Sequence, residues 1–483
     1  MERENAWKSY TDQDKSELTE LCEGYKSFLS QCKTERLATK RAIEMAEDAG
    51  YVSLKEAIAA GKTLKPGDKV WIDNYGKAIM LVQIGTNDIE AGVNILGAHI
   101  DSPRLDLKQN PLYEASDFVL LDTHYYGGIK NYQWVALPLA LKGVVVKKDG
   151  TVVDISLGDD PADPVFCVTD LLPHLGAEQM KKNGREVVEG ESLDVLFGSE
   201  PLIVEGAEKT TEAKPAKKEQ AYEEQIASTA QKEAVRAHIM QLLLERYGIE
   251  EEDFLSAEIE VVPAGDARDC GLDRSMVIGY GQDDRVCAYM SLVAQLAIED
   301  PTRTAVCILV DKEEIGSVGA TGMTSAFFEN TMAEILNLMG KQGDLALRRC
   351  LASSSMLSSD VSAAFDPSYA SVFEPKNSAY CGRGLVFNKY TGSGGKSGSN
   401  DANAEYMAAL RKVMDDAGVK YQTAELGRVN AGGGGTIAYI PAKYGMNVID
   451  SGVAVLSMHS PWEVTSKADI YEAYKGYKAF LNA

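Results

Sequence analysis

Two adjacent glutamates stand where an apolar segment runs into a glycine turn. The segment RTAVCIL (303–309) is followed by VDKEEIGSVG (310–319), which places Glu313 and Glu314 directly after the apolar run. Such a run predicts a strand that is buried on both faces. Carboxylates at the end of a buried strand need partners, and a metal ion would satisfy them. One glutamate could then bind the metal while the other serves as a base.

A histidine and an aspartate also stand at the end of an apolar segment, near residue 100. GAHIDSP (97–103) ends an apolar segment and places His99 and Asp101 two residues apart. On a strand, residues with this spacing point to the same side. The aspartate could therefore hold the second ring nitrogen of a metal-bound histidine. An ordinary histidine at a surface strand end would give the same pattern.

Three more polar positions follow along the chain. QDDR (282–285) contributes Asp283, although an acidic pair before a helix also serves simply to cap it. Asp360 ends SSD (358–360), after a segment at 329–356 that we predict to be helical throughout. His459 lies in MHS (458–460), after an apolar strand.

These donors are carboxylates and imidazoles without cysteine. Such a set suits zinc first, with cobalt or manganese as alternatives. The number of these imidazole and carboxylate donors fits two divalent ions that share a bridging carboxylate. Two ions held in this way activate a water and polarise a carbonyl. The sequence therefore predicts a hydrolytic centre with two metal ions.

The donors need a scaffold that brings strand ends together. Outside the middle of the chain, helices alternate with apolar strands; residues 13–60 read as helical throughout. Alternation of this kind predicts a layered α/β core, whose sites lie at the ends of strands. Between residues 107 and 263, short strands with Gly and Asp turns predominate, and residues 205–235 read as a charged surface loop that grades into a helix. We therefore expect a discontinuous catalytic domain at 1–106 and 264–483, with a β-rich domain inserted at 107–263.

Composition narrows the class of protein. The chain has 483 residues and a formal net charge of −23, which argues against nucleic acid as a partner. The longest apolar stretch, 134–141, is too short to span a bilayer, and the N-terminus has no apolar segment of a signal peptide. The eight cysteines form no CxxC pair, which is typical of free thiols in a reducing compartment. We expect a cytoplasmic protein that binds neither nucleic acid nor membrane.

Taken in order, the motifs resemble those of a known family. GAHIDSPRLDLK, DDRVCA, VDKEEIGS, SSD and MHS, with KVWIDNYGKAIMLVQIG, LPLALKG and GGGGTIAYIPAKYGMNVID, are similar to the M18 family of metalloaminopeptidases. The resemblance spans nearly the whole chain. It implies a di-zinc exopeptidase-like α/β/α domain with an inserted dimerisation domain. It also implies an activity that removes the N-terminal residue of peptides, and assembly of dimers into a tetrahedral homododecamer.

The resemblance also implies a role for each motif residue. His99 and Asp360 would bind the first metal, His459 and Glu314 the second, and Asp283 would bridge the two, while Asp101 would orient His99 and Glu313 would be the general base. Glu313 would take a proton from the attacking water and return it to the leaving amine.

Three further positions match the family near the substrate. His174 corresponds to a histidine that reaches a neighbouring subunit's site, although this chain has Glu178 where aspartyl members carry a second histidine. Lys389 matches a lysine near the substrate, and Gly434 lies in a glycine loop. A surface histidine and a solvent-exposed lysine are the simpler readings of the first two.

Two alternatives stay open from the residues alone. A di-metal amidase or deacylase would use a similar ligand set, and a catalytically silent scaffold would need none. The acidic overall charge favours neutral or basic N-terminal residues in the substrate.

Overall fold

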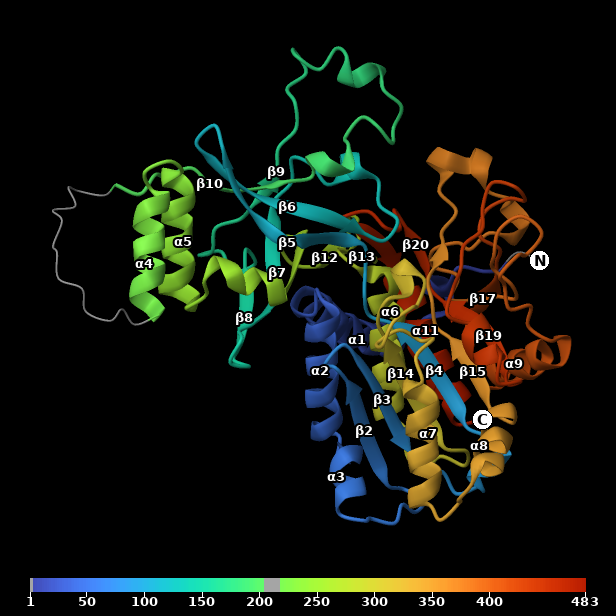
Figure 1. Cartoon of the computed structure of the whole chain (residues 1–483). Coiled ribbons are helices and arrows are strands. Elements are labelled where there is room, and N and C mark those ends of the chain that lie inside the picture. Colours follow the sequence, from blue (N-terminus) through green and yellow to red (C-terminus); the bar gives the residue numbers. More distant parts are fainter. Residues whose placement is uncertain (1–2, 204–217) are drawn as a thin grey trace. The chain divides into compact units, whose positions relative to one another are not determined.

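The computed structural model describes residues 3–203 and 218–483, which form two compact units (Figure 1). Unit 1 comprises Met1–Ser102 and Asp266–Ala483, and unit 2 comprises Pro103–Gly265. The sequence places the inserted segment at 107–263, within a few residues of unit 2. All seven predicted metal-centre residues lie in unit 1.

Unit 1 is built on a nine-stranded sheet. In spatial order its strands are β1 (Val52–Ser53), β2 (Lys69–Asn74), β3 (Ala78–Gln83), β14 (Ala305–Val310), β4 (Asn94–His99), β15 (Ser355–Ser358), β19 (Asn447–Gly452), β17 (Leu385–Asn388) and β18 (Tyr421–Thr423). The central four, β14, β4, β15 and β19, run parallel to one another. Their carboxyl ends therefore meet at one edge, where open α/β sheets carry their sites.

Helices cover both faces of this sheet (Figure 1). One face packs against α1 (Asp12–Gln31), α2 (Glu35–Asp48), α6 (Gln282–Leu296), α9 (Ala404–Asp416) and α11 (Lys467–Leu481). The other packs against α3 (Leu54–Ala59), α7 (Phe327–Leu338), α8 (Asp344–Ala352) and α10 (Tyr439–Ala442). Alternate residues of β4 serve the two cores, Leu96 in one and Ile95 in the other. Because both faces are buried, β14 (AVCILV) and the middle of β4 (ILGA) read as continuous apolar runs, whereas β15 and β19 carry buried polar residues such as Ser358 and Asp450. The predicted layered α/β fold is confirmed.

Two predicted helices are interrupted. The helical pattern at 13–60 divides into α1, α2 and α3, because Thr34 and Ser53 cap new helix N-termini with their side chains. The pattern at 329–356 divides into α7 and α8 and then ends in β15. Asp360 therefore follows a strand rather than the predicted helix, and this strand is the one that carries it to the sheet edge.

A second, smaller sheet completes unit 1. Its strands, in order, are β12 (Arg268–Cys270), β13 (Met276–Gly279), β21 (Glu463–Ser466), β20 (Ala454–Leu456) and β16 (Ser362–Ala363). β13 leads into α6, and the segment between β20 and β21 carries His459. The pairing of β13 with β21 thus links the chain segments that hold Asp283 and His459.

Unit 2 is a seven-stranded antiparallel sheet. Its order is β8 (Val152–Leu157), β7 (Leu139–Val146), β11 (Ala257–Pro263), β5 (Arg104–Ala115), β6 (Phe118–Tyr126), β10 (Val195–Gly198) and β9 (Cys167–Val168). Two helices, α4 (Lys218–Thr229) and α5 (Ala234–Tyr247), belong to the same unit. Of the charged segment predicted at 205–235, residues 205–217 lie outside the described part of the chain. The β-rich character predicted for this stretch agrees with its strands.

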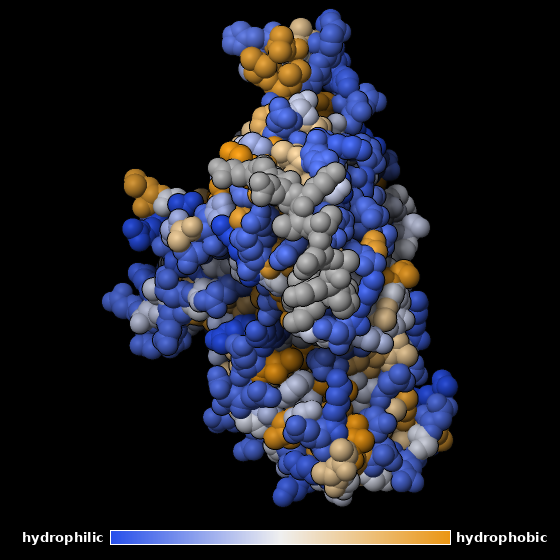
Figure 2. Space-filling model, turned by 60° about the vertical axis from the view of Figure 1, so that its left-hand side comes forward, coloured by the Kyte–Doolittle hydropathy of each residue, from blue (hydrophilic) through white to orange (hydrophobic). Residues whose placement is uncertain are grey.

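The surface is consistent with the strong net charge. The face drawn in Figure 2 is mostly hydrophilic, with hydrophobic groups scattered over it. Among the described residues, no helix is both long and apolar enough to cross a membrane. All eight cysteines are free thiols.

Candidate metal centre

Five chain segments bring the predicted donors to one edge of the unit 1 sheet. His99 is the last residue of β4, Asp283 lies at the start of α6, Glu313 and Glu314 form a 3₁₀ turn just after β14, Asp360 follows β15 and His459 follows β20. β4 and β14 pair in parallel, and His99 lies opposite Val310. The register of two neighbouring strands thus sets the distance between the histidine and the glutamate pair.

Asp283 occupies the middle of the cluster. Its Oδ1 lies 3.2 Å from Nε2 of His99, and its Oδ2 lies 3.1 Å from Nε2 of His459. Each carboxylate oxygen therefore faces a different imidazole. This is the arrangement that a carboxylate needs in order to be shared by two metal ions.

The remaining donors are arranged around the two histidines. Nε2 of His99 lies 3.9 Å from Oδ1 of Asp360 and 3.9 Å from Oε2 of Glu313. Nε2 of His459 lies 3.5 Å from Oε1 of Glu314. Donor atoms within 4.8 Å of one another form three groups: His99 with Asp284 and Asp360, His99 with Glu313 and Glu314, and His459 with Asp283 and Glu314. Such imidazole and carboxylate sets fit divalent transition metals.

The burial of the carboxylates in the cluster also fits the binding of cations. Oε1 of Glu314 is buried and accepts no hydrogen bond from the described residues. The carboxylate of Asp284 is fully buried beside the same cluster. Buried carboxylates crowded together repel one another and lack hydration, so positive charge at their centre would stabilise them.

Asp101 stands behind the cluster. Its two carboxylate oxygens accept hydrogen bonds, each of 3.2 Å, from the backbone N–H groups of Glu313 and Glu314. Nδ1 of His99, the ring nitrogen that faces away from Asp283, lies 3.0 Å from the backbone carbonyl oxygen of Asp101 and 3.3 Å from its Oδ1. One side chain thus contacts both the first histidine and the turn that carries the glutamates. Such a contact fixes the tautomer and orientation of an imidazole.

Burial shifts the acid–base properties of the carboxylates. It raises the pKa of Glu313 to about 7, against the attraction of His99. It raises the pKa of Glu314 and of Asp360 well above their usual values, and repulsion from neighbouring carboxylates adds to the effect. Burial also acts on Asp283, but hydrogen bonds with His459 and His99 outweigh it and hold the pKa of this carboxyl below its usual range. A carboxylate with a pKa near neutrality is suited to act as a base.

Two residues of the centre are absent from the predicted set. Asp284 is fully buried and shares a donor group with His99 and Asp360; the adjacent acid in QDDR is its only sequence signal, and we read that pair partly as a helix cap. Glu463 is also buried and accepts backbone hydrogen bonds from Asp283 and His459. A lone glutamate four residues after His459 gives no pattern that would reveal this contact.

The three predicted substrate residues lie outside the donor cluster. His174 is an exposed residue of unit 2, whereas the cluster belongs to unit 1. Lys389 forms an ion pair with Asp401. Gly434 accepts a hydrogen bond of 2.7 Å from the backbone N–H of Gly392. Lys389 and Gly434 thus have partners in unit 1, and no contact of theirs with the donor residues is observed.

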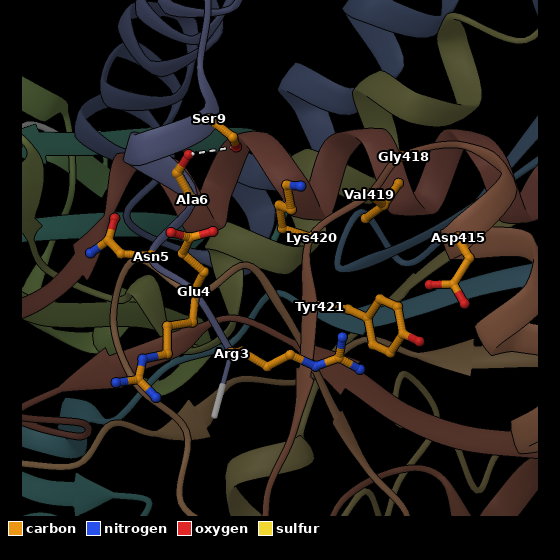
Figure 3. A pocket seen from close by; sticks show the side chains of 11 residues that line it. Arg3, Glu4, Asn5, Ala6, Ser9, Asp415, Gly418, Val419, Lys420 and Tyr421 are labelled. Carbon is orange, nitrogen blue, oxygen red and sulfur yellow. Dashed lines mark hydrogen bonds between the residues drawn. The ribbon is translucent and has the colours of Figure 1, made fainter. Parts of the chain in front are cut away.

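A separate cavity of unit 1 holds none of these residues (Figure 3). It measures about 300 Å³ and is lined by the N-terminal segment, Arg383 and residues 415–421. The guanidinium of Arg3 stacks 4.5 Å from the ring centroid of Tyr421. Its lining carries charges of both signs, since Glu4 lies beside Arg3 (Figure 3). The cavity lacks the converging donor atoms of the metal centre.

Comparisons with known proteins agree with this geometry. Residues 28–481 match the family model described as "Aminopeptidase I zinc metalloprotease (M18)". The chain is 56% identical over 481 residues to a probable M18 family aminopeptidase 1 of Clostridium acetobutylicum, with 100% of this chain and 98% of the relative covered.

Solved structures give the same result. A crystal structure of an M18 family aminopeptidase from Thermotoga maritima superposes with a TM-score of 0.90 at 41% identity, covering 100% of this chain and 99% of that one. The S. cerevisiae mApe1 dodecamer shares the fold, with a TM-score of 0.74 at 18% identity and coverage of 96% and 97%. The match of the family model over nearly the whole length and the close relative place this chain in the M18 family of zinc metalloaminopeptidases.

Proposed function

We propose that the cluster around Asp283 is the catalytic centre with which this M18 family member, a metal-dependent aminopeptidase, removes the N-terminal residue of peptides. His99 and Asp360 would hold one divalent ion, His459 and Glu314 would hold the other, and Asp283 would serve both. Zinc is the expected metal, as the family description indicates. The placing of each carboxylate oxygen of Asp283 against a different histidine is the observation that carries the proposal.

In this centre Glu313 is the general base. Two bound divalent ions would supply a polarised peptide carbonyl and an acidified water. Glu313 takes a proton from the attacking water and then returns it to the nitrogen of the leaving amine. Oε2 of Glu313 lies 3.9 Å from Nε2 of His99, which places this carboxyl beside the proposed metal ligands, as a positioned base requires. Asp101 holds the imidazole of His99 and the backbone of the glutamate turn while this happens.

The test separates the base from the metal ligands. Glu313→Gln should keep its bound metal and its fold but lose turnover by about 10²–10⁴-fold, the range for a positioned acid–base group. Metal content is measured by elemental analysis, and turnover with aminoacyl-anilides. Glu313 would not be the base if the variant turned over at near-normal rate with its full metal content.

A substrate panel tests the reaction itself. The purified chain is assayed on aminoacyl-anilides, dipeptides and N-acyl peptides, then again after chelation and after return of zinc, cobalt or manganese. Chelator-sensitive release of free N-terminal residues is expected, with neutral or basic residues preferred because the protein is strongly acidic. Cleavage of the N-acyl substrates alone would point to a deacylase.

Assembly and location form the broader part of the proposal. The mApe1 dodecamer supports a homo-oligomer, and we propose a tetrahedral dodecamer assembled from dimers that form through unit 2. The segment around His174 is rich in exposed apolar side chains, such as Leu175 and Met180, which a partner copy would cover. In the assembly His174 would reach a neighbouring active site, and Lys389 and Gly434 would line the path of the peptide. Eight free cysteines support a cytoplasmic location.

A further inference from the structure

Glu463 lies under the metal centre as the first residue of β21. Its side chain is only 1% exposed. Its Oε1 accepts a hydrogen bond of 2.8 Å from the backbone N–H of His459, and its Oε2 accepts one of 3.1 Å from the backbone N–H of Asp283. One carboxylate thus binds the main chain of two donor residues that come from distant parts of the sequence.

The position of Glu463 is itself fixed. β21 pairs with β13, and Glu463 lies opposite Gly279. The amide Nε2 of Gln282 donates to the carbonyl oxygen of Glu463 at 2.6 Å, and Oε1 of Gln282 accepts a hydrogen bond of 3.1 Å from the hydroxyl of Tyr25. These side chains are fully buried. The main chain of Glu463 is therefore held by the sheet and by the buried side chain of Gln282.

His459 needs such support because of its backbone. Its φ is +64°, in the left-handed region that non-glycine residues seldom adopt, and Ser457 two residues earlier has φ +58°. A backbone of this kind persists only when its surroundings fix it. The hydrogen bond from N–H of His459 to Glu463 supplies that fixation and aims the imidazole at Asp283.

We propose that Glu463 is a positioning residue of the metal centre. It fixes the main chain of Asp283 and of His459, so that a carboxylate oxygen of the first and Nε2 of the second converge on the same ion. Asp101 provides a parallel on the other side of the centre, since its carboxylate accepts the backbone N–H groups of Glu313 and Glu314. The inference rests on the metal centre proposed above.

The chain offers a matched control in Asp469 of α11. This carboxylate is also fully buried, and it also accepts two backbone hydrogen bonds, of 2.8 Å from Gly382 and 2.7 Å from Gly384. Neither glycine carries a metal donor. Replacing either acid by its amide places an NH₂ group against a backbone donor, so both variants lose one such bond. Only Glu463→Gln releases the main chain of a metal ligand.

The experiment compares three full-length variants with the wild type: Glu463→Gln, Glu463→Asp and Asp469→Asn. Affinity for Zn²⁺ is measured by competition with a chromophoric chelator, and geometry by the visible absorption of bound Co²⁺. Both Glu463 variants should lose about 10–100-fold in affinity for one of the two ions, the range for residues that orient ligands. They should also change the Co²⁺ spectrum, whereas Asp469→Asn should change neither quantity.

Glu463→Asp keeps the charge but is one methylene shorter, so it separates positioning from electrostatic attraction. Wild-type affinity and spectrum in Glu463→Asp would overturn the proposal, whatever Glu463→Gln does. A wild-type chain that binds no metal at all would instead refute the proposed metal centre.

A measurement on the wild type covers the case in which the variants do not fold. In hydrogen exchange of the metal-free chain, peptides containing the amides of Asp283 and His459 should exchange slowly, because Glu463 holds both N–H groups. Exchange as fast as in exposed loops would overturn the proposal.

Discussion

At the scale of residues, the proposed metal centre depends on side chains that each contact more than one neighbour. Asp283 faces two histidines, Asp101 contacts an imidazole and two backbone amides, and Glu463 accepts two more amides. A carboxylate has two oxygens and several lone pairs, so it can serve two partners without strain. Replacement by an amide removes one of these acceptors and adds a donor in its place.

Asp283→Asn tests the shared ligand directly. The variant can offer an oxygen to only one ion, so we expect the affinity for both ions to fall by more than the 10–100-fold typical of residues that only orient ligands. Zinc stoichiometry after exhaustive dialysis gives the readout, and turnover should be lost with the metal. The neighbouring Asp284→Asn is the control, and we expect it to retain at least one ion. The opposite result, with metal retained in Asp283→Asn and lost in Asp284→Asn, would reassign the bridge to Asp284.

The candidate donor residues are recognisable in the sequence because the patterns that carry them are local. A glutamate pair after an apolar run, or a histidine two residues from an aspartate, is visible in a few letters. Glu463 and Asp284 were not predicted, since Glu463 acts on amides that only the folded chain brings near it. Pairing of β13 with β21 creates that contact, and no short motif encodes it.

At the scale of elements, the layered α/β core was predictable and the ends of its helices were less so. β14 (AVCILV) and the ILGA segment of β4 are apolar on both faces, which makes these two strands recognisable in the sequence. The breaks after α1 and α2 depend on the caps at Thr34 and Ser53, which lie within otherwise helical patterns. The sequence predicts helix as far as residue 356, because the short segment SMLS has neither helical nor strand periodicity of its own, whereas the structure has strand β15 there.

Gly452 shows how closely these elements approach one another. A Cβ at this last residue of β19 would lie 1.9 Å from the carbonyl oxygen of Asp360. Gly452→Ala should therefore displace the segment that carries Asp360 and cost about 1–3 kcal/mol of unfolding free energy, as overpacking of a core does. We expect weaker zinc binding together with a lower melting temperature.

Gly395→Ala is the control. A Cβ at this position meets no atom within 4 Å, so zinc affinity and melting temperature should stay at wild-type values. Equal behaviour of the two variants would show that the close approach has no consequence.

Asp469 of α11 gives the fold a pH dependence of defined sign. Burial raises the pKa of Asp469 to about 8, although the hydrogen bonds from Gly382 and Gly384 act in the opposite direction. In the unfolded chain, the pKa of an aspartate is about 3.9. Between these values the folded chain keeps a proton that the unfolded chain has released. The contribution of Asp469 to stability is therefore complete below about pH 4 and is lost as the pH rises towards 8, by at most about 1.4 kcal/mol per pH unit.

Asp469→Asn cannot titrate, so its stability should fall less steeply than that of the wild type across this window. Urea unfolding of the metal-free proteins at intervals from pH 4.5 to 8.5 measures the two slopes. Because all other titrating groups are common to both proteins, the difference in slope belongs to Asp469. Parallel curves would mean that this carboxyl titrates alike in the folded and unfolded chain.

At the scale of the whole molecule, the chain has two units. Unit 1 contains the proposed metal centre, and the sheet-rich unit 2 carries exposed apolar side chains. Leu175 is 68% exposed and Met180 is 75% exposed, beside His174. The pattern of short strands with Gly and Asp turns predicts the β-rich insertion. The partner that would cover these side chains comes instead from the family resemblance, because apolar exposure does not identify what binds to it.

The proposed assembly can be tested through these same side chains. Twelve copies of a 52.3 kDa chain would total about 630 kDa. Replacing Leu175 and Met180 together by serine should lower the mass measured by light scattering, because the interface would lose apolar area that water otherwise hydrates unfavourably. Activity should fall with the mass while zinc content stays unchanged, since the proposed metal donors all belong to unit 1.

Leu272→Ser, at a fully exposed leucine of unit 1, is the control and should keep both mass and activity. A double variant that kept its mass would rule out this segment as the contact between copies, and with it the role of His174 in a neighbouring site.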